Sequence, residues 1–241
     1  MEKDSENVLR REKMKAMAQL SNVLGHEIRG PLGVIRNSVY FLKLKLQESQ
    51  DEKILKHLRI LEEEIMILDQ LMEQTLDFGR NREPRMILKD VPTLMRETLM
   101  QVTLPENIEV DQTCEEGLPS VWLDPDQMKR VLQNLILNAI QAMPEGGRLG
   151  LSARVVPPSL EMPNEKMIEI SVQDTGCGIP EEIRENVFEP LFTTKVKSTG
   201  LGLTVCRNIV HSHQGSLVLA SEAGKGTRAS VRIRALREGG E

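Results

Sequence analysis

The sequence predicts an all-α helical hairpin followed by an α+β sandwich in which helices cover one face of a sheet. Up to about residue 80, apolar residues recur every three, four or seven positions, whereas short β-type and helical patterns follow one another beyond it. The chain has 241 residues, enough for two domains that each bury a core. Because aromatic residues make up only 2% of the chain, those cores must consist of Leu, Ile, Val and Met.

The first 80 residues are predicted to form a helical hairpin. One long helix is expected over residues 5–47, with a bend at Pro31 because proline removes a backbone donor. Its apolar stripe consists of Met17, Leu20, Leu24, Ile28, Pro31, Ile35, Leu42 and Leu46. After a polar turn at 47–51, the second helix has heptad positions at Ile54, Leu58, Leu61, Ile65, Leu68, Met72 and Thr75. Two helices with one stripe each cannot bury both, so we expect a homodimeric four-helix bundle, with an ordinary hairpin within one chain as the alternative.

A histidine lies on the polar side of the first helix. At about 100° per residue, His26 is roughly opposite the apolar stripe. We therefore expect it to face solvent, where it can titrate or react. The other histidines give weaker signals, because His57 lies off the heptad and His211 and His213 lie at the end of the last predicted helix.

A linker at 81–90 is predicted to lead into a second domain at 91–241. The expected helices are 91–101, 125–143 and 201–212, and the expected strands are 108–113, 120–123, 149–155, 167–174, 216–220 and 227–233. Asp124-Pro125 is typical of a helix start, with an N-cap followed by proline at the first helical position. Residues 157–165 are expected to form a loop.

Composition argues against nucleic-acid binding and indicates the cellular compartment. The net charge of −5 and the scarcity of aromatic residues argue against direct binding of nucleic acid. Cys114, Cys177 and Cys206 are widely spaced and lack paired metal-ligand spacing, which favours a reducing cytoplasm. Because no apolar run reaches about 18 residues and no export signal is evident, we expect a cytoplasmic segment without membrane contact, whether or not a longer sensor precedes it.

Two motifs of the second domain suggest a site for a nucleotide base and a metal ion. Asn134 and Asn138 are four residues apart on a predicted helix, so both amides project from one face and can bind hydrated Mg²⁺ and phosphate oxygens. Asp174 leaves a predicted strand, and its carboxylate can accept a hydrogen bond from an adenine amino group. Gly176 and Gly178 let the backbone approach the ring. Taken singly, these motifs also fit a polar surface pair and a turn.

Two further motifs suggest a phosphate site and a mobile segment. Residues 198–203 open a helix with Gly200 and Gly202, and N–H groups and the dipole at a helix start favour phosphate. The glycine spacing fits neither a Walker A loop nor a dinucleotide fingerprint. Phe188 and Phe192 are candidate anchors for the segment between them and the helix, although they also fit a small apolar cluster.

In this order and spacing, the motifs resemble those of two-component sensor histidine kinases, from about Met14 to Ile233. The H box corresponds to His26-Glu27-Ile28-Arg29-Gly30-Pro31-Leu32, the N box to Asn134 to Ala139, the G1 box to Asp174 to Gly178, and the F box to Phe188 to Phe192. Gly200 and Gly202 match the G2 box, and Gly224-x-Gly226-Thr227 matches the last glycine motif. The resemblance implies a dimerisation and phosphotransfer domain followed by a Bergerat ATP-binding domain of the GHKL superfamily.

The resemblance also implies a reaction. ATP phosphorylates His26, Glu27 accepts the ring proton, and the phosphoryl group passes to an aspartate of a separate response regulator. Asp174 selects adenine, Mg²⁺ lies near Asn134 and Asn138, and residues 193–199 form a short lid. The other implied ATP contacts are Gly176, Gly178, Lys195, Thr199, Gly200, Leu201 and Gly202.

Three residues depart from the family pattern. Gly30 stands where the family often has Thr, Asn or Ser, so we expect phosphatase activity to be weak or to use another group. Ser198 replaces a glycine of the G2 box, and Gln141 stands where many relatives carry a lysine.

Two alternative functions remain open. One is a degenerate kinase that acts as a dimeric scaffold, which is disfavoured because every identifiable catalytic position is filled. The other is an ATP-hydrolysing relative with the same fold. Such relatives activate water with a carboxylate at the first N-box position, and that residue is Asn134 here.

Overall fold

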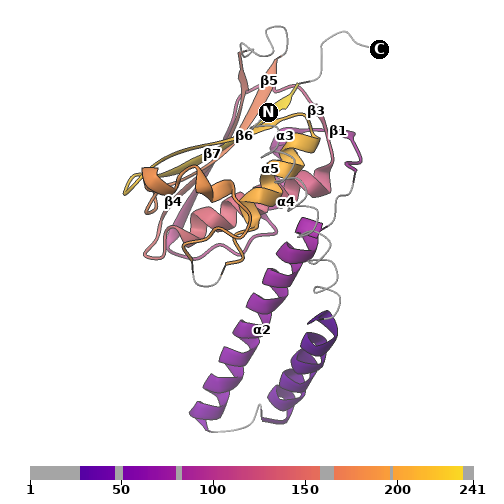
Figure 1. Cartoon of the computed structure of the whole chain (residues 1–241), viewed down its shortest axis with the longest axis vertical. Helices are drawn as coiled ribbons and strands as arrows, with labels where there is room; N and C mark the ends of the chain where they lie inside the picture. The colour runs from indigo at the N-terminus through magenta and orange to yellow at the C-terminus, as the bar shows by residue number, and fades with distance from the viewer. Residues whose placement is uncertain (1–27, 47–50, 80–82, 158–165, 196–197, 236–241) are drawn as a thin grey trace, which may run out of the picture. The chain divides into compact units, whose positions relative to one another are not determined.

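The computed structural model describes residues 28–46, 51–79, 83–157, 166–195 and 198–235. Figure 1 labels the helices and strands of these residues. The chain divides into two units, one of residues 1–82 with 191–201 and the other of residues 83–190 with 202–241. His26 and Glu27 lie outside the described residues. Among the residues that are described, no helix is both long and apolar enough to cross a membrane.

The described residues of the first unit form two helices, residues 28–46 and α2 (Glu52–Gly79). Asp51 precedes α2, and its side chain accepts a hydrogen bond from the backbone N–H of Lys53 at 2.9 Å. An acidic side chain at this position satisfies one of the unpaired donors of a helix start. The polar turn predicted at 47–51 therefore ends in a residue suited to begin the second helix.

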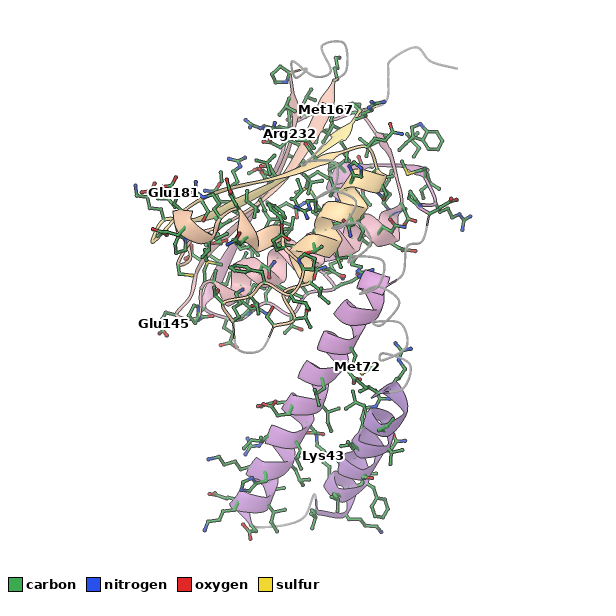
Figure 2. The ribbon with its side chains drawn as sticks, in the orientation of Figure 1. Lys43, Met72, Glu145, Met167, Glu181 and Arg232 are labelled. Atoms are coloured by element: carbon green, nitrogen blue, oxygen red, sulfur yellow. The ribbon has the colours of Figure 1, made fainter. Side chains whose placement is uncertain are left out.

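Ion pairs show that the two helices run antiparallel. Arg36 contacts Asp69 at 3.2 Å, and Lys43, labelled in Figure 2, contacts Glu62 at 2.8 Å. Seven residues forward in the first helix thus correspond to seven residues back in α2. Because these pairs are partly exposed, they contribute little stability and mainly report the register.

The heptad residues of the hairpin fall into a buried half and an exposed half. The buried half consists of Leu32, Val39, Leu58, Ile65 and Met72, which pack together. The predicted stripe of the first helix omitted Leu32 and Val39, which face α2 and are buried, whereas its members Ile28, Ile35 and Leu42 are exposed. The exposed half consists of Ile28, Ile35, Leu42, Ile54, Leu61 and Leu68. These six side chains, which we call the exposed stripe, are 37% to 50% exposed. Buried and exposed apolar residues therefore alternate along each helix of the hairpin.

The second unit is an α+β sandwich. Its five-stranded sheet has, in order, β2 (Ile108–Cys114), β4 (Gly147–Val156), β5 (Met167–Asp174), β7 (Gly226–Arg234) and β6 (Ser216–Glu222). β2 pairs with β4 in parallel, and the other pairs are antiparallel. The helices are α3 (Val91–Leu99), α4 (Pro125–Gln141) and α5 (Gly202–Ser212). All three lie on one face of the sheet, as predicted (Figure 1).

The core lies between these helices and the sheet. The largest fully buried side chains are Leu94, Met95, Leu123, Met128, Leu132, Ile136, Leu149, Leu151, Ile168, Ile170, Ile233 and Val91. They are all Leu, Met, Ile or Val, as the scarcity of aromatic residues predicts. The predicted start of α4 is also confirmed, because the side chain of Asp124 accepts hydrogen bonds from the N–H groups of Asp126 and Gln127.

Short elements account for the differences from the predicted secondary structure. β1 (Ile87–Lys89) lies within the range 81–90 that the sequence predicts as linker, and it pairs with β3 (Val121–Leu123). Two 3₁₀ turns, η1 (Glu181–Ile183) and η2 (Asn186–Phe188), follow β5. Three-residue elements depend on partners distant in sequence, so local periodicity does not reveal them.

The face of the sheet opposite the helices carries a charged cluster. Glu169 on β5 is only 2% exposed, and its carboxylate contacts Arg154 at 2.7 Å and Arg232, labelled in Figure 2, at 2.9 Å. Arg228 lies 3.9 Å away. Because both close contacts come from neighbouring strands, this cluster ties β4, β5 and β7 together.

Candidate nucleotide-binding site

Asn134, one of the two amide residues of α4, lies next to the start of α5. Asn134 and Asn138 are both half-buried and share one face of the helix. A Cβ atom built on Gly202 would lie 3.5 Å from Oδ1 of Asn134. The structure therefore brings together two residues predicted for the site, one from the N box and one from the G2 box.

A buried thiol helps to hold α5 against α4. Cys206 is fully buried, and its Sγ lies 3.7 Å from the carbonyl oxygen of Val131. Burial raises the pKa of this thiol to about 12. Cys206 is thus an unreactive packing residue that keeps the first turn of α5 near Asn134.

Asp174, at the end of β5, is buried and its carboxylate is fixed by backbone donors. Its Oδ1 accepts hydrogen bonds from the N–H groups of Gly176 at 2.9 Å and Thr227 at 3.2 Å. These contacts come from the following loop and from β7. The carboxylate therefore has one defined orientation, as recognition of a planar base requires.

The loop after Asp174 is joined to three other elements. The N–H of Cys177 donates to the carbonyl of Ala142 at the end of α4, and the N–H of Gly224 donates to the carbonyl of Cys177. Gly178 has a φ of +67°, and a Cβ there would overlap the carbonyl oxygen of Glu222. Only glycine fits this position, because both the left-handed backbone and the close approach exclude a side chain.

Two hydroxyl residues of the site were not among the predicted contacts. Ser221 accepts a hydrogen bond from the N–H of Ile179 at 2.8 Å, and its hydroxyl lies 2.9 Å from that of Thr227. Thr227 also reaches Asp174 through its backbone. The signal for Thr227 was present in Gly226-Thr227, whereas Ser221 has no motif of its own.

The remaining predicted contacts fall in the other unit of the chain. Lys195, Thr199, Gly200 and Leu201 belong to the stretch 191–201, whereas Gly202 begins α5 in the α+β unit. Within that stretch, Oγ1 of Thr199 accepts a hydrogen bond from the N–H of Leu201 at 3.3 Å.

A shallow polar hollow of about 290 Å³ lies beside Asp174 but is not formed by the α4 amides. It is lined by residues of β5, β6, β7 and the β6–β7 hairpin, among them Gln173, Ala220 and Arg228. Gln173 and Arg228 are paired across strands and lie on the face that carries Glu169. The hollow is therefore separate from the face on which Asn134 and Gly202 meet.

The three cysteines differ in exposure, and the described part of the chain contains no disulfide between them. Cys177 is exposed, Cys114 is half-buried and Cys206 is buried. Burial raises the pKa of the Cys114 thiol above its ordinary value. Cys177, in the loop after Asp174, is thus the most accessible thiol of the three.

Comparison with known proteins identifies related sequences. Residues 123–237 match the family described as histidine kinase-, DNA gyrase B-, and HSP90-like ATPase. The sensor histidine kinase ZraS of Escherichia coli O157:H7 is 32% identical over 226 residues, which cover 92% of this chain and 47% of ZraS. The chain therefore spans about half the length of this relative.

The solved structures similar to this chain are also histidine kinases. The catalytic domain of histidine kinase ThkA is 30% identical with a TM-score of 0.53, over 63% of this chain and 98% of that domain. Histidine kinase ThkA in complex with the response regulator protein TrrA is 26% identical with a TM-score of 0.66. That match covers 99% of this chain and 67% of the solved chain.

Proposed function

Because the chain belongs to the sensor histidine kinases of two-component systems, we propose that it binds ATP in its α+β unit and transfers the γ-phosphoryl group to His26. The observation that carries this proposal is the approach of Asn134 to the start of α5 at Gly202, in the same unit that fixes the carboxylate of Asp174 with two backbone N–H groups. These three residues come from the end of a strand and from two helices, and each has a chemical role toward a nucleotide. We place the reaction in the cytoplasm, where ATP is abundant and thiols stay reduced.

The geometry supports a division of labour within the nucleotide site. The carboxylate of Asp174, oriented by two backbone N–H groups, would accept a hydrogen bond from the adenine amino group. The first turn of α5 offers N–H donors and a helix dipole to phosphate oxygens. Asn134 lies beside that turn, so an amide and a helix start would meet the phosphates together.

The residues of α4 fit a magnesium ion that accompanies ATP. Amide oxygens are hard ligands of the type that Mg²⁺ accepts, and Asn134 and Asn138 share one face of the helix. Among the described residues, no three His, Cys, Asp or Glu side chains gather as an alternative site. Mg²⁺ held there would offset the negative charge of the phosphate groups.

The chemistry at His26 follows from its sequence context. A neutral imidazole nitrogen attacks the γ-phosphorus, the bond to the β,γ-bridging oxygen breaks, and ADP leaves. An imidazole with an ordinary pKa near 6.5 is mostly neutral at pH 7, so it is a competent nucleophile. Glu27 would accept the ring proton.

We propose that the hairpin dimerises through the exposed stripe. Its six residues alternate along each helix with the buried heptad residues, so a second hairpin would complete every layer of a four-helix bundle. Burial of apolar side chains that are 37% to 50% exposed would supply the driving force.

The partner for phosphotransfer is proposed to be the receiver domain of a response regulator. The complex of histidine kinase ThkA with the response regulator protein TrrA supports this partner by analogy. The phosphoryl group would move from His26 to a receiver aspartate, regenerating the neutral imidazole. We expect weak phosphatase activity because Gly30, exposed on the first helix, offers no side chain to orient a water molecule.

Incubation with γ-labelled ATP and Mg²⁺ tests the proposed reaction. We expect an acid-labile, base-stable label that is lost in His26→Ala and kept in His57→Ala, which replaces an exposed histidine of α2. Asp174→Asn should lose both the label and nucleotide binding. Nucleotide binding without label would contradict kinase activity and favour the scaffold, and equal release of phosphate by wild type and His26→Ala would favour an ATPase.

A further inference from the structure

Two side chains of α5 hold the F-box residue Phe188. The carbonyl oxygen of Phe188 accepts a hydrogen bond from Oγ1 of Thr204 at 3.1 Å and another from Nη2 of Arg207 at 3.1 Å. The guanidinium carbon of Arg207 also lies 5.2 Å from the centre of the Phe188 ring. A charged donor and a cation–π contact make this attachment stronger than a neutral hydrogen bond alone.

The backbone shortly after Phe188 comes close to the backbone just before α5. A Cβ atom on Gly200 would lie 2.5 Å from the carbonyl oxygen of Phe192 and 2.6 Å from the carbonyl carbon of Leu191. Gly200 has a φ of +67°, so glycine is required there on both counts. The backbones at 191–192 and at 200 are therefore in contact.

Leu191 is held in an unfavourable conformation at this point. Its φ is +65°, a region that leucine rarely adopts and that persists only where the surroundings impose it. Its side chain is 55% exposed, so burial of that side chain does not impose the conformation. The attachment of Phe188, three residues earlier, is a constraint on the path of the chain into this turn.

We propose, on the basis of the ATP-binding function above, that Arg207 is a positioning residue for nucleotide binding. By holding Phe188 on α5, it ties the start of the stretch 189–201 to the same helix into which that stretch leads at Gly202. Phe188, three residues before the turn at Leu191, is thereby fixed to α5. Without Arg207, the start of the stretch gains conformational freedom that nucleotide binding must remove, and affinity falls.

Titration of the full chain with a fluorescent ATP analogue and Mg²⁺ tests this role. Arg207→Met keeps most of the side-chain length and removes the donors and the charge, so we expect an affinity about 10-fold weaker. Arg207→Lys, which keeps the charge and a donor, should recover part of the loss. The matched control is Arg96→Met, which replaces an exposed arginine of α3 and should stay within about twofold of wild type.

A kinetic comparison separates positioning from chemistry. The ATP concentration for half-maximal labelling of His26 should rise about 10-fold in Arg207→Met, whereas the rate at saturating ATP should stay within about twofold. An unchanged half-maximal concentration, or a loss confined to the saturated rate, would overturn the positioning role. If Arg207→Met does not fold, Thr204→Val removes the other donor, and the same shift in smaller size is expected.

Limited trypsin digestion without nucleotide provides an independent measurement. We expect cleavage after Lys195 to be several times faster in Arg207→Met than in Arg96→Met, because the released stretch more readily enters the protease. Equal cleavage rates would overturn the inference. If the variant is cleaved faster but the wild type binds no nucleotide, the attachment of Phe188 is supported. The proposed ATP-binding function is then overturned.

Discussion

The helical hairpin and the α+β unit use their apolar residues differently. In the α+β unit, α3, α4 and α5 enclose a core against the sheet, and its largest buried side chains are less than 2% exposed. In the hairpin, the buried heptad residues alternate with the exposed stripe. The α+β unit therefore completes its core within one chain, whereas the hairpin leaves half of its core positions for another surface. Stability should depend on protein concentration in the hairpin only.

A cavity in the core of the α+β unit is expected to have the largest effect. Leu132 on α4 is fully buried, and Leu132→Ala should lower the free energy of unfolding by about 2–5 kcal/mol. Fluorescence of Trp122, the one tryptophan of the chain, reports this unit in urea titrations. Leu137→Ala, on the exposed side of α4, is the control and should cost less than about 1 kcal/mol. If the urea unfolding transition of the α+β unit shifts with protein concentration, its core is not complete within one chain.

A charge in the exposed stripe should act through association. Leu61→Asp places a carboxylate where the second hairpin is expected to pack, so we expect the dimer to weaken by at least about 100-fold. Sedimentation equilibrium measures this directly. Met66→Asp, also on α2 but outside the stripe and 62% exposed, should leave the association unchanged. Equal association of both variants would refute the proposed interface.

His213 tests how far the α+β unit, unlike the hairpin, depends on contacts between residues far apart in the sequence. This buried side chain accepts a hydrogen bond from the backbone N–H of Asp124 at 2.9 Å, and its Nδ1 lies 2.8 Å from the carbonyl oxygen of Ile209. His213→Phe leaves the N–H of Asp124 unpaired and should cost about 1–3 kcal/mol, whereas the carbonyl of Ile209 keeps the Ser212 hydroxyl as a donor at 2.8 Å. His211→Phe, at an exposed position, should cost little. Urea titration followed by Trp122 fluorescence distinguishes the two.

Glu169 should make the stability of the α+β unit depend on pH. Burial raises the pKa of this carboxyl, but hydrogen bonds from Arg154 and Arg232 more than offset that effect and hold the pKa below its ordinary value. Because the folded pKa is lowered, the stabilisation is complete above about pH 4.5 and is lost as the pH falls through the folded pKa. Melting temperatures between pH 6 and pH 3 should fall more steeply for wild type than for Glu169→Gln. Parallel curves would contradict this assignment.

Repeating patterns within the α+β unit were read correctly from the sequence. The helices and strands of the α+β unit follow from periodicity, and the N-cap Asp124 follows from its proline neighbour. The sequence also placed Asp174 at the end of a strand and Asn134 and Asn138 on one helix face. These features depend on residues within a few positions of each other, where geometry is nearly fixed by the backbone.

Features that depend on distant partners were missed. β1 exists because it pairs with β3, more than 30 residues later, and the isolated triplet Ile87–Lys89 carries no signal of its own. His213 gave no sign of its contact with Asp124, and Arg207 gave none of its contact with Phe188. A side chain whose partner is set by tertiary packing can be identified only once the fold is known.

The unequal burial of the cysteines has a practical consequence. A maleimide dye reacts with thiolate, and Cys206 is fully buried with a pKa raised to about 12. Cys177 is exposed in the loop that follows Asp174, and its backbone contacts both Ala142 and Gly224. A brief labelling reaction at neutral pH should therefore attach the dye selectively at Cys177 without removing any cysteine. The native sequence thus provides its own attachment point for an optical sensor of nucleotide occupancy.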